Sequence, residues 1–100
     1  MMQPDKLYFF LKMIPPRANF FQNETEEERK VMQNHVVYWA PYIKEGIVVV
    51  FGPIADAKHP YGSAVVRVDT REQLDGMIAG DPANGIYVYE VNDMMAITKY

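Results

Sequence analysis

Hydrophobic and polar residues follow one another along this chain in patterns that predict short β-strands. From Lys6 to Ile14, hydrophobic side chains occupy both faces of an extended segment. Pro15 and Pro16 end this segment, because a proline has no backbone N–H to donate. Further strands are predicted over residues 47–51, 64–68 and 86–91, with a short strand or extended tail over 95–99. Gly52-Pro53 is expected to stop the strand over residues 47–51.

A first helix is predicted from Thr25 to about residue 45. Thr25 is followed three residues later by Glu28, which is the spacing of a capping box, and Gly46 supplies a residue that tolerates the left-handed end of a helix. At 100° per residue, seven residues fall on one hydrophobic stripe. They are Val31, Met32, His35, Val36, Trp39, Tyr42 and Ile43. A histidine therefore lies among residues expected to face the core.

A second helix is predicted from Thr70 to Ala79. Thr70 and Gln73 have the same capping spacing, and Gly80 is expected to close the helix before Asp81-Pro82 stops it. We interpret Asp81 as a helix-terminating turn residue in preference to an acid in a pocket. Asn84-Gly85 then predicts a turn before the fourth strand.

The order of elements, β-α-β-β-α-β followed by a tail, is that of an α+β protein of the ferredoxin-like type. In this arrangement both helices cover one face of an antiparallel sheet. Because the strands are hydrophobic on both sides, the other face also needs a cover. We therefore expect a homodimer in which two sheets pack face to face.

Length and composition restrict the class of protein. A chain of 100 residues, of which 26 are Leu, Ile, Val or Phe, matches one folded domain over residues 1–100. The absence of cysteine excludes a disulfide scaffold and thiolate chemistry, and is compatible with a cytoplasmic protein. A net charge of −3 gives no electrostatic footprint for nucleic acid, and no segment is long enough to span a membrane.

Several short segments, taken in order, resemble the YCII-related family. They are Ile14-Pro15-Pro16-Arg17, His35-Val36-Val37-Tyr38-Trp39, Gly46, Phe51-Gly52-Pro53, Asp56, Tyr61-Gly62, Asp81-Pro82 and Tyr89-Glu90-Val91. The resemblance implies a dimeric α-β barrel of ferredoxin-like protomers and a pocket with a catalytic His and Asp. It also implies that a few similar proteins are cofactor-independent lyases on aromatic breakdown products.

By position, the resemblance carries the family's pair onto His35 and onto Asp56 of the Gly-Pro-x-x-Asp loop. A histidine on the buried stripe of a helix must be hydrogen-bonded, and imidazole exchanges protons near neutral pH. Asp56 is expected to orient the imidazole ring. The alternatives are a core histidine bonded to a backbone carbonyl and an aspartate that caps its own turn.

Other residues are candidates for binding a substrate. Arg17 has the geometry to clamp a carboxylate, and Trp39 and Tyr61 are expected to lie near a pocket for a flat organic ligand. His59, with Asp56 and His35, offers a metal two nitrogens and one oxygen. We nevertheless predict no metal and no cofactor, since the chain lacks metal-binding spacings and phosphate-loop motifs.

The sequence thus predicts a cofactor-independent enzyme, a lyase or isomerase that transfers a proton on a small organic molecule through a His–Asp pair. A non-catalytic metabolite-binding or assembly module of the same dimeric fold is the main alternative. A cofactor-free monooxygenase on the same fold is a third possibility.

Overall fold

A computed structural model describes residues 6–98 of the chain. Seven elements follow one another in the order expected from the sequence, with one short helix added. They are β1 (Leu7–Ile14), α1 (Phe20–Asn23), α2 (Glu26–Lys44), β2 (Val48–Ile54), β3 (Tyr61–Val68), α3 (Arg71–Gly80) and β4 (Val88–Met94).

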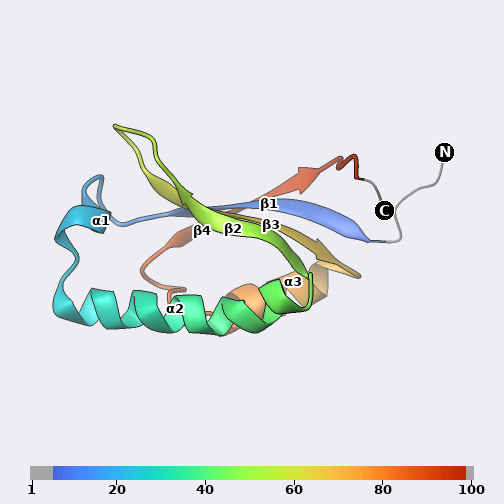
Figure 1. Cartoon of the computed structure of the whole chain (residues 1–100), viewed down its shortest axis with the longest axis horizontal. Helices are drawn as coiled ribbons and strands as arrows, with labels where there is room; N and C mark the ends of the chain where they lie inside the picture. The colour runs from blue at the N-terminus through green and yellow to red at the C-terminus, as the bar shows by residue number, and fades with distance from the viewer. Residues whose placement is uncertain (1–5, 99–100) are drawn as a thin grey trace.

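The four strands form one antiparallel sheet in the order β2-β3-β1-β4. In the centre of this sheet β1 lies between β3 and β4, so that Phe10 faces Val65 on one side and Asn92 on the other. Figure 1 shows α2 and α3 together on one face of the sheet, while the opposite face carries no helix formed by residues 6–98. The predicted ferredoxin-like α+β fold is confirmed.

The ends of the two long helices match the sequence prediction. Thr25 accepts a hydrogen bond from the Glu28 backbone N–H, and the Glu28 carboxylate accepts one from the Thr25 N–H, which completes the capping box of α2. Thr70 caps α3 in the same way by accepting from the N–H of Gln73. Gly46 has a φ of 80° and so occupies the left-handed region after α2.

Several boundaries differ from the prediction. β3 begins at Tyr61, three residues before the predicted start, and β4 covers Val88–Met94 where 86–91 was predicted. Gly52-Pro53 does not stop β2, which continues to Ile54; β2 is at the edge of the sheet and pairs only with β3, so the missing proline N–H is tolerated. The loop after β1 contains α1, a single turn too short to show a hydrophobic period. Residues 95–98 form no strand, and Lys99 of the predicted tail lies outside the described residues.

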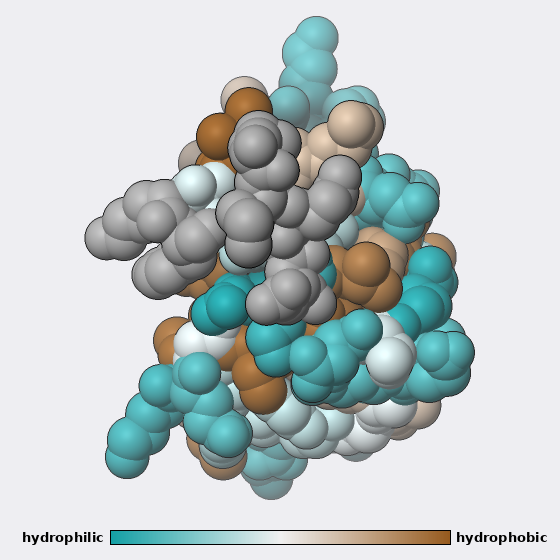
Figure 2. Space-filling model, turned by 90° about the vertical axis from the view of Figure 1, so that its right-hand side faces the viewer, coloured by the Kyte–Doolittle hydropathy of each residue, from teal (hydrophilic) through white to brown (hydrophobic). Residues whose placement is uncertain are grey.

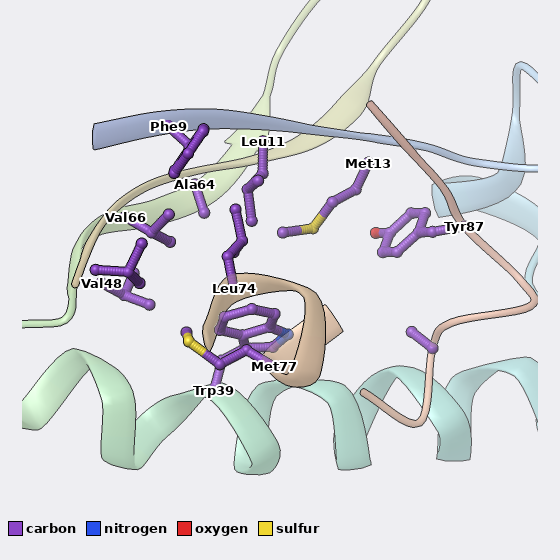
Figure 3. Close-up of a cluster of buried hydrophobic side chains, with 12 residues drawn as sticks. Phe9, Leu11, Met13, Trp39, Val48, Ala64, Val66, Leu74, Met77 and Tyr87 are labelled. Atoms are coloured by element: carbon purple, nitrogen blue, oxygen red, sulfur yellow. The ribbon is translucent and has the colours of Figure 1, made fainter. Parts of the chain in front are cut away.

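The core lies between the sheet and the two long helices. Figure 3 shows side chains from β1 pointing toward α2 and meeting Trp39 and Leu74, with Tyr87 at one end of the cluster. Two residues of the predicted stripe of α2 are not part of this core, because Val36 is 54% exposed and Ile43 is 41% exposed. The buried arc of α2 is thus narrower than its hydrophobic residues suggest.

Hydrophobic residues also lie on the surface. Val50, Ile54, Val88 and Met94 are exposed on the sheet strands, and at the end of the molecule shown in Figure 2 hydrophobic patches alternate with polar side chains. None of the helices in residues 6–98 is long and apolar enough to cross a membrane.

Candidate functional site

His35 lies in the middle of α2 and faces the sheet. Its side chain is 4% exposed, and Trp39, one helical turn later on the same face, is fully buried. The prediction that His35 lies inside the buried stripe is confirmed. Both side chains carry N–H groups, so this part of the core needs a hydrogen-bond acceptor.

Asp81 supplies that acceptor from the turn that follows α3. The residue is the C-cap of α3, and Pro82 prevents the helix from continuing. Its Oδ1 accepts a hydrogen bond from the Ala83 N–H at 2.8 Å, which makes the tight turn that directs the carboxylate toward α2. Its side chain is completely buried.

The two residues form a hydrogen-bonded pair. His35 Nδ1 lies 2.7 Å from Asp81 Oδ2 and 2.9 Å from Oδ1. Trp39 Nε1 donates to the same Oδ2 at 2.8 Å, and the Tyr89 hydroxyl donates to it as well. Since a carboxylate only accepts, Nδ1 carries the proton in this pair.

These donors fix the charge of the carboxyl group. Burial by itself would raise the pKa of Asp81, but the hydrogen bonds from His35, Tyr89, Trp39 and the Ala83 N–H outweigh burial and hold the pKa below its usual value. Asp81 is therefore an ionised carboxylate inside the protein. It holds the imidazole ring in a single orientation and a single tautomer.

The other nitrogen of the ring, His35 Nε2, has no hydrogen-bond partner within residues 6–98. The ring lies beside two aromatic side chains, with centroid distances of 5.4 Å to both Phe51 and Tyr87. An imidazole whose Nδ1–H is bound to a carboxylate presents Nε2 as a proton acceptor. The arrangement is thus suited to general base or general acid chemistry at Nε2.

Asp56 does not take the place predicted for it beside His35. It lies in the exposed turn between β2 and β3, where its Oδ1 accepts from the N–H groups of Lys58 at 2.8 Å and His59 at 2.9 Å. These two backbone hydrogen bonds lower its pKa. Asp56 is the self-capping turn residue of our alternative interpretation, and Asp81, interpreted only as a turn residue, orients His35 instead.

Two of the predicted substrate-binding residues lie near Asp56. They line an open groove of about 460 Å³ between the loop after β1 and the β2–β3 turn, which we call the hairpin groove. Its polar side chains are Lys12, Arg17, Asp56, His59 and Tyr61. The Lys12 ammonium stands 4.6 Å from the centre of the Tyr61 ring, a cation–π contact.

The sheet separates the hairpin groove from the His35–Asp81 pair. Lys12 and Tyr61 alternate along their strands with the buried residues Met13 and Gly62, so their side chains lie on the face without helices. Trp39, by contrast, joins the pair. The predicted substrate-binding residues are therefore divided between two regions.

The Arg17 guanidinium already binds a carboxylate of this chain, that of Glu28. Its two terminal nitrogens lie 3.0 and 2.7 Å from the two carboxylate oxygens of Glu28, and its Nε donates to Asn23 Oδ1 at 2.8 Å. The hydrogen bond from Arg17, with that from Thr25, lowers the pKa of Glu28 to about 2. Arg17 thus binds a carboxylate of α2 in place of the substrate carboxylate predicted for it.

The three residues considered for a metal do not meet. His35 is buried beside Asp81, whereas His59 lies with Asp56 on the other side of the sheet. Among residues 6–98, no three His, Asp or Glu side chains gather as a metal site would require.

Sequence reasoning missed Tyr89 and Tyr87 as parts of the site. Tyr87 directly precedes β4 and Tyr89 is the second residue of β4; their rings lie 6.5 Å apart. The sequence did contain one signal for the site: the side-chain N–H groups of His35 and Trp39, both predicted to be buried, require a hydrogen-bond acceptor nearby. Asp81 is that acceptor, and Tyr89, eight residues later in the chain, donates to the same carboxylate.

Comparison with known proteins gives a consistent picture. No curated protein matches the chain. A family model, the YCII-related domain, matches residues 8–98, which run from the second residue of β1 to beyond the end of β4. The chain therefore belongs to the YCII-related family.

Proposed function

We propose that this protein is a cofactor-independent enzyme that transfers a proton on a small organic molecule, with His35 Nε2 as base or acid. One observation carries the proposal: a buried carboxylate holds Nδ1 of the imidazole while Nε2 has no partner within residues 6–98. Orienting an imidazole through its other nitrogen is a recurring arrangement of acid–base catalysis.

The Asp81 carboxylate supports this role electrostatically. When Nε2 takes a proton, the ring becomes a cation, and the adjacent ionised carboxylate stabilises that cation. Trp39 and Tyr89 keep the carboxylate itself in place. Isomerisation and elimination are the reactions that such a pair performs without further groups.

A thermal-shift screen of small phenols, lactones and carboxylates tests the proposal. A compound at 100 times its Kd adds about 2.7 kcal/mol of stability. We expect one chemical class to stabilise the native protein and the His59→Asn control, but not the His35→Asn variant. Turnover of that class, measured next, should be lost only in His35→Asn. Equal binding and turnover in all three proteins would contradict a catalytic role for His35.

A non-catalytic binding module is the second candidate, favoured by the hairpin groove. Its volume of about 460 Å³ is within the range of small-molecule sites, and it is open, whereas His35 is buried. For this function, Tyr61→Ala should abolish binding of the stabilising compounds while His35→Asn leaves binding unchanged.

We also propose that two copies of the chain associate through the face of the sheet that carries no helix. Phe10 and Val65 face each other near its centre and are only half-buried, and Val50 and Val88 are exposed farther out. A second copy is the partner whose hydrophobic face matches this one by symmetry. Light scattering should give twice the chain mass for the native protein and the single mass for Phe10→Asp.

A further inference from the structure

Tyr87 is a buried tyrosine that the proton-transfer chemistry proposed above does not use. It precedes β4, is 5% exposed, and packs against the rings of Phe20 and His35. Figure 3 shows its ring between β1 and α2, with the hydroxyl directed toward the Met13 side of the core.

Its neighbour Tyr89 shows what a buried tyrosine normally does. The Tyr89 hydroxyl donates to the Asp81 carboxylate. The Tyr87 hydroxyl, in contrast, has no hydrogen-bond partner within residues 6–98. Buried tyrosine hydroxyls usually find a partner, because an unpaired buried donor loses its hydrogen bond to water without replacement. The Tyr87 hydroxyl is not among the side-chain atoms of residues 6–98 that are sealed from solvent without a partner, so water, or a ligand that supplies an acceptor, can reach it.

The position of Tyr87 suits a ligand shared with His35. The two rings lie 5.4 Å apart in an edge-to-face arrangement, and His35 Nε2 is the other polar atom here without a partner within residues 6–98. Beside the hydroxyl, β3 carries Gly62. A Cβ at position 62 would stand 3.2 Å from the Met13 Cβ and 3.4 Å from the Tyr87 hydroxyl, so the glycine lets both side chains pack closely against β3.

We propose that Tyr87 is a second catalytic residue, which donates a hydrogen bond to the oxygen of a carbonyl substrate while His35 Nε2 removes a proton from the adjacent carbon. The inference deepens the proposed function and depends on it. It names the substrate class: a ketone, ester or lactone with an acidic C–H next to the carbonyl.

The step balances without a further reactant. The C–H bond breaks, its proton goes to Nε2, and its electron pair forms a carbon–carbon double bond. The carbonyl π electrons move to oxygen, and the resulting enolate accepts the hydrogen bond from Tyr87. His35 then returns the proton to a different carbon, which completes an isomerisation. Alternatively, a leaving group departs from the neighbouring carbon with its bonding pair, which completes an elimination.

The surroundings of Tyr87 keep its hydroxyl protonated, so that it can donate a hydrogen bond. Burial raises the pKa of its hydroxyl, and the negative charges of Asp81 and Glu24 raise it further. The hydroxyl therefore retains its proton while an enolate oxygen forms beside it, as a hydrogen-bond donor to an oxyanion must.

Binding of 4-nitrophenol tests the inference, because its phenolate resembles an enolate and its absorbance reports ionisation. The variants are Tyr87→Phe, His35→Gln and the control Tyr8→Phe, which changes a buried tyrosine on the other face of the sheet. Circular dichroism confirms that each is folded. We expect Tyr87→Phe to weaken binding about 10- to 100-fold, as a lost hydrogen bond to a charged oxygen does. Tyr8→Phe should bind like the native protein, and His35→Gln should bind the probe in its neutral form.

The outcomes separate the two proposals. If His35→Gln prevents ionisation of the probe but Tyr87→Phe binds like Tyr8→Phe, the role of Tyr87 is overturned and the proposed function stands. If ionisation is the same in His35→Gln and the native protein, the proposed function fails and the two-residue step fails with it. Absence of binding to the native protein at millimolar probe overturns the oxyanion site.

Discussion

Two aspartates in this protein make nearly the same local turn and have different roles. Asp56 and Asp81 each accept a hydrogen bond from the backbone N–H two residues later, at 2.8 Å in both cases. Asp56 lies in an exposed turn, and its donors within residues 6–98 are the backbone N–H groups of Lys58 and His59. Asp81 is buried and also accepts from His35, Trp39 and Tyr89.

The difference shows that tertiary position decides the chemistry of a turn. The pKa values of both carboxyl groups are lowered, but for different reasons. Two backbone N–H groups are sufficient to lower the pKa of the exposed Asp56. For the buried Asp81, hydrogen bonds from side chains must outweigh burial, which would raise its pKa. Only the buried carboxylate can therefore orient another side chain.

Stability should separate the two aspartates most strongly. Asp81→Ala leaves the N–H groups of His35 and Trp39 buried without an acceptor, and we expect a loss of about 3–5 kcal/mol in the free energy of unfolding. Asp56→Ala removes only an exposed turn cap and should have a much smaller effect. Urea unfolding followed by circular dichroism measures both. Similar losses for the two variants would contradict the difference we describe.

The two histidines provide a second comparison. His59 is exposed beside Asp56, whereas the His35 side chain is 4% exposed beside Asp81. Diethyl pyrocarbonate should therefore modify His59 at least about tenfold faster, because so little of the His35 side chain is exposed that local opening speeds its reaction. The His59→Asn variant isolates the slow reaction. Equal rates at the two positions would show that His35 is freely accessible.

The same reaction can test which segment covers His35. Phe20 of α1 is fully buried and packs 6.3 Å from the Tyr87 ring, and the Arg17 guanidinium lies 5.2 Å from the Phe20 ring. Arg17→Ala releases the loop from Glu28, so we expect modification of His35 to become several-fold faster. Arg71→Ala, which breaks an exposed ion pair with Asp75, is the matched control and should leave the rate unchanged.

The smallest expected effect is a change in the stability of the folded protein at acidic pH. The pKa of Asp81 is lower in the folded protein than its unfolded value of about 3.9, so its contribution to stability is complete above that pH. It disappears as the pH falls through the folded value. The stability difference between the native protein and Asp81→Asn should therefore shrink below about pH 4. A difference that does not shrink below about pH 4 would contradict the lowered pKa.

Most of the fold was predictable because its signals are local. Capping at Thr25 and Thr70 depends on residues three positions apart, and strand alternation depends on neighbours. The continuation of β2 through Pro53 was not predictable in this way. It depends on β2 being an edge strand, which is a property of the whole sheet.

The site was predictable only in part. The buried position of His35 follows from the helical period. Its partner does not, because Asp56 and Asp81 both follow ordinary turn rules and the chain must fold before one of them meets α2. A stronger inference was available from His35 and Trp39 together, since two buried donors one turn apart require an acceptor between them.

Pro53 has a consequence for aggregation. An exposed edge strand with free N–H and C=O groups can recruit a strand from another molecule and extend a sheet without limit. β2 is such an edge, and it carries the exposed residues Val49 and Val50. Pro53 removes one N–H donor from this edge, which makes it a poorer template for an added strand. The residue that we expected to end the strand instead protects it from uncontrolled growth.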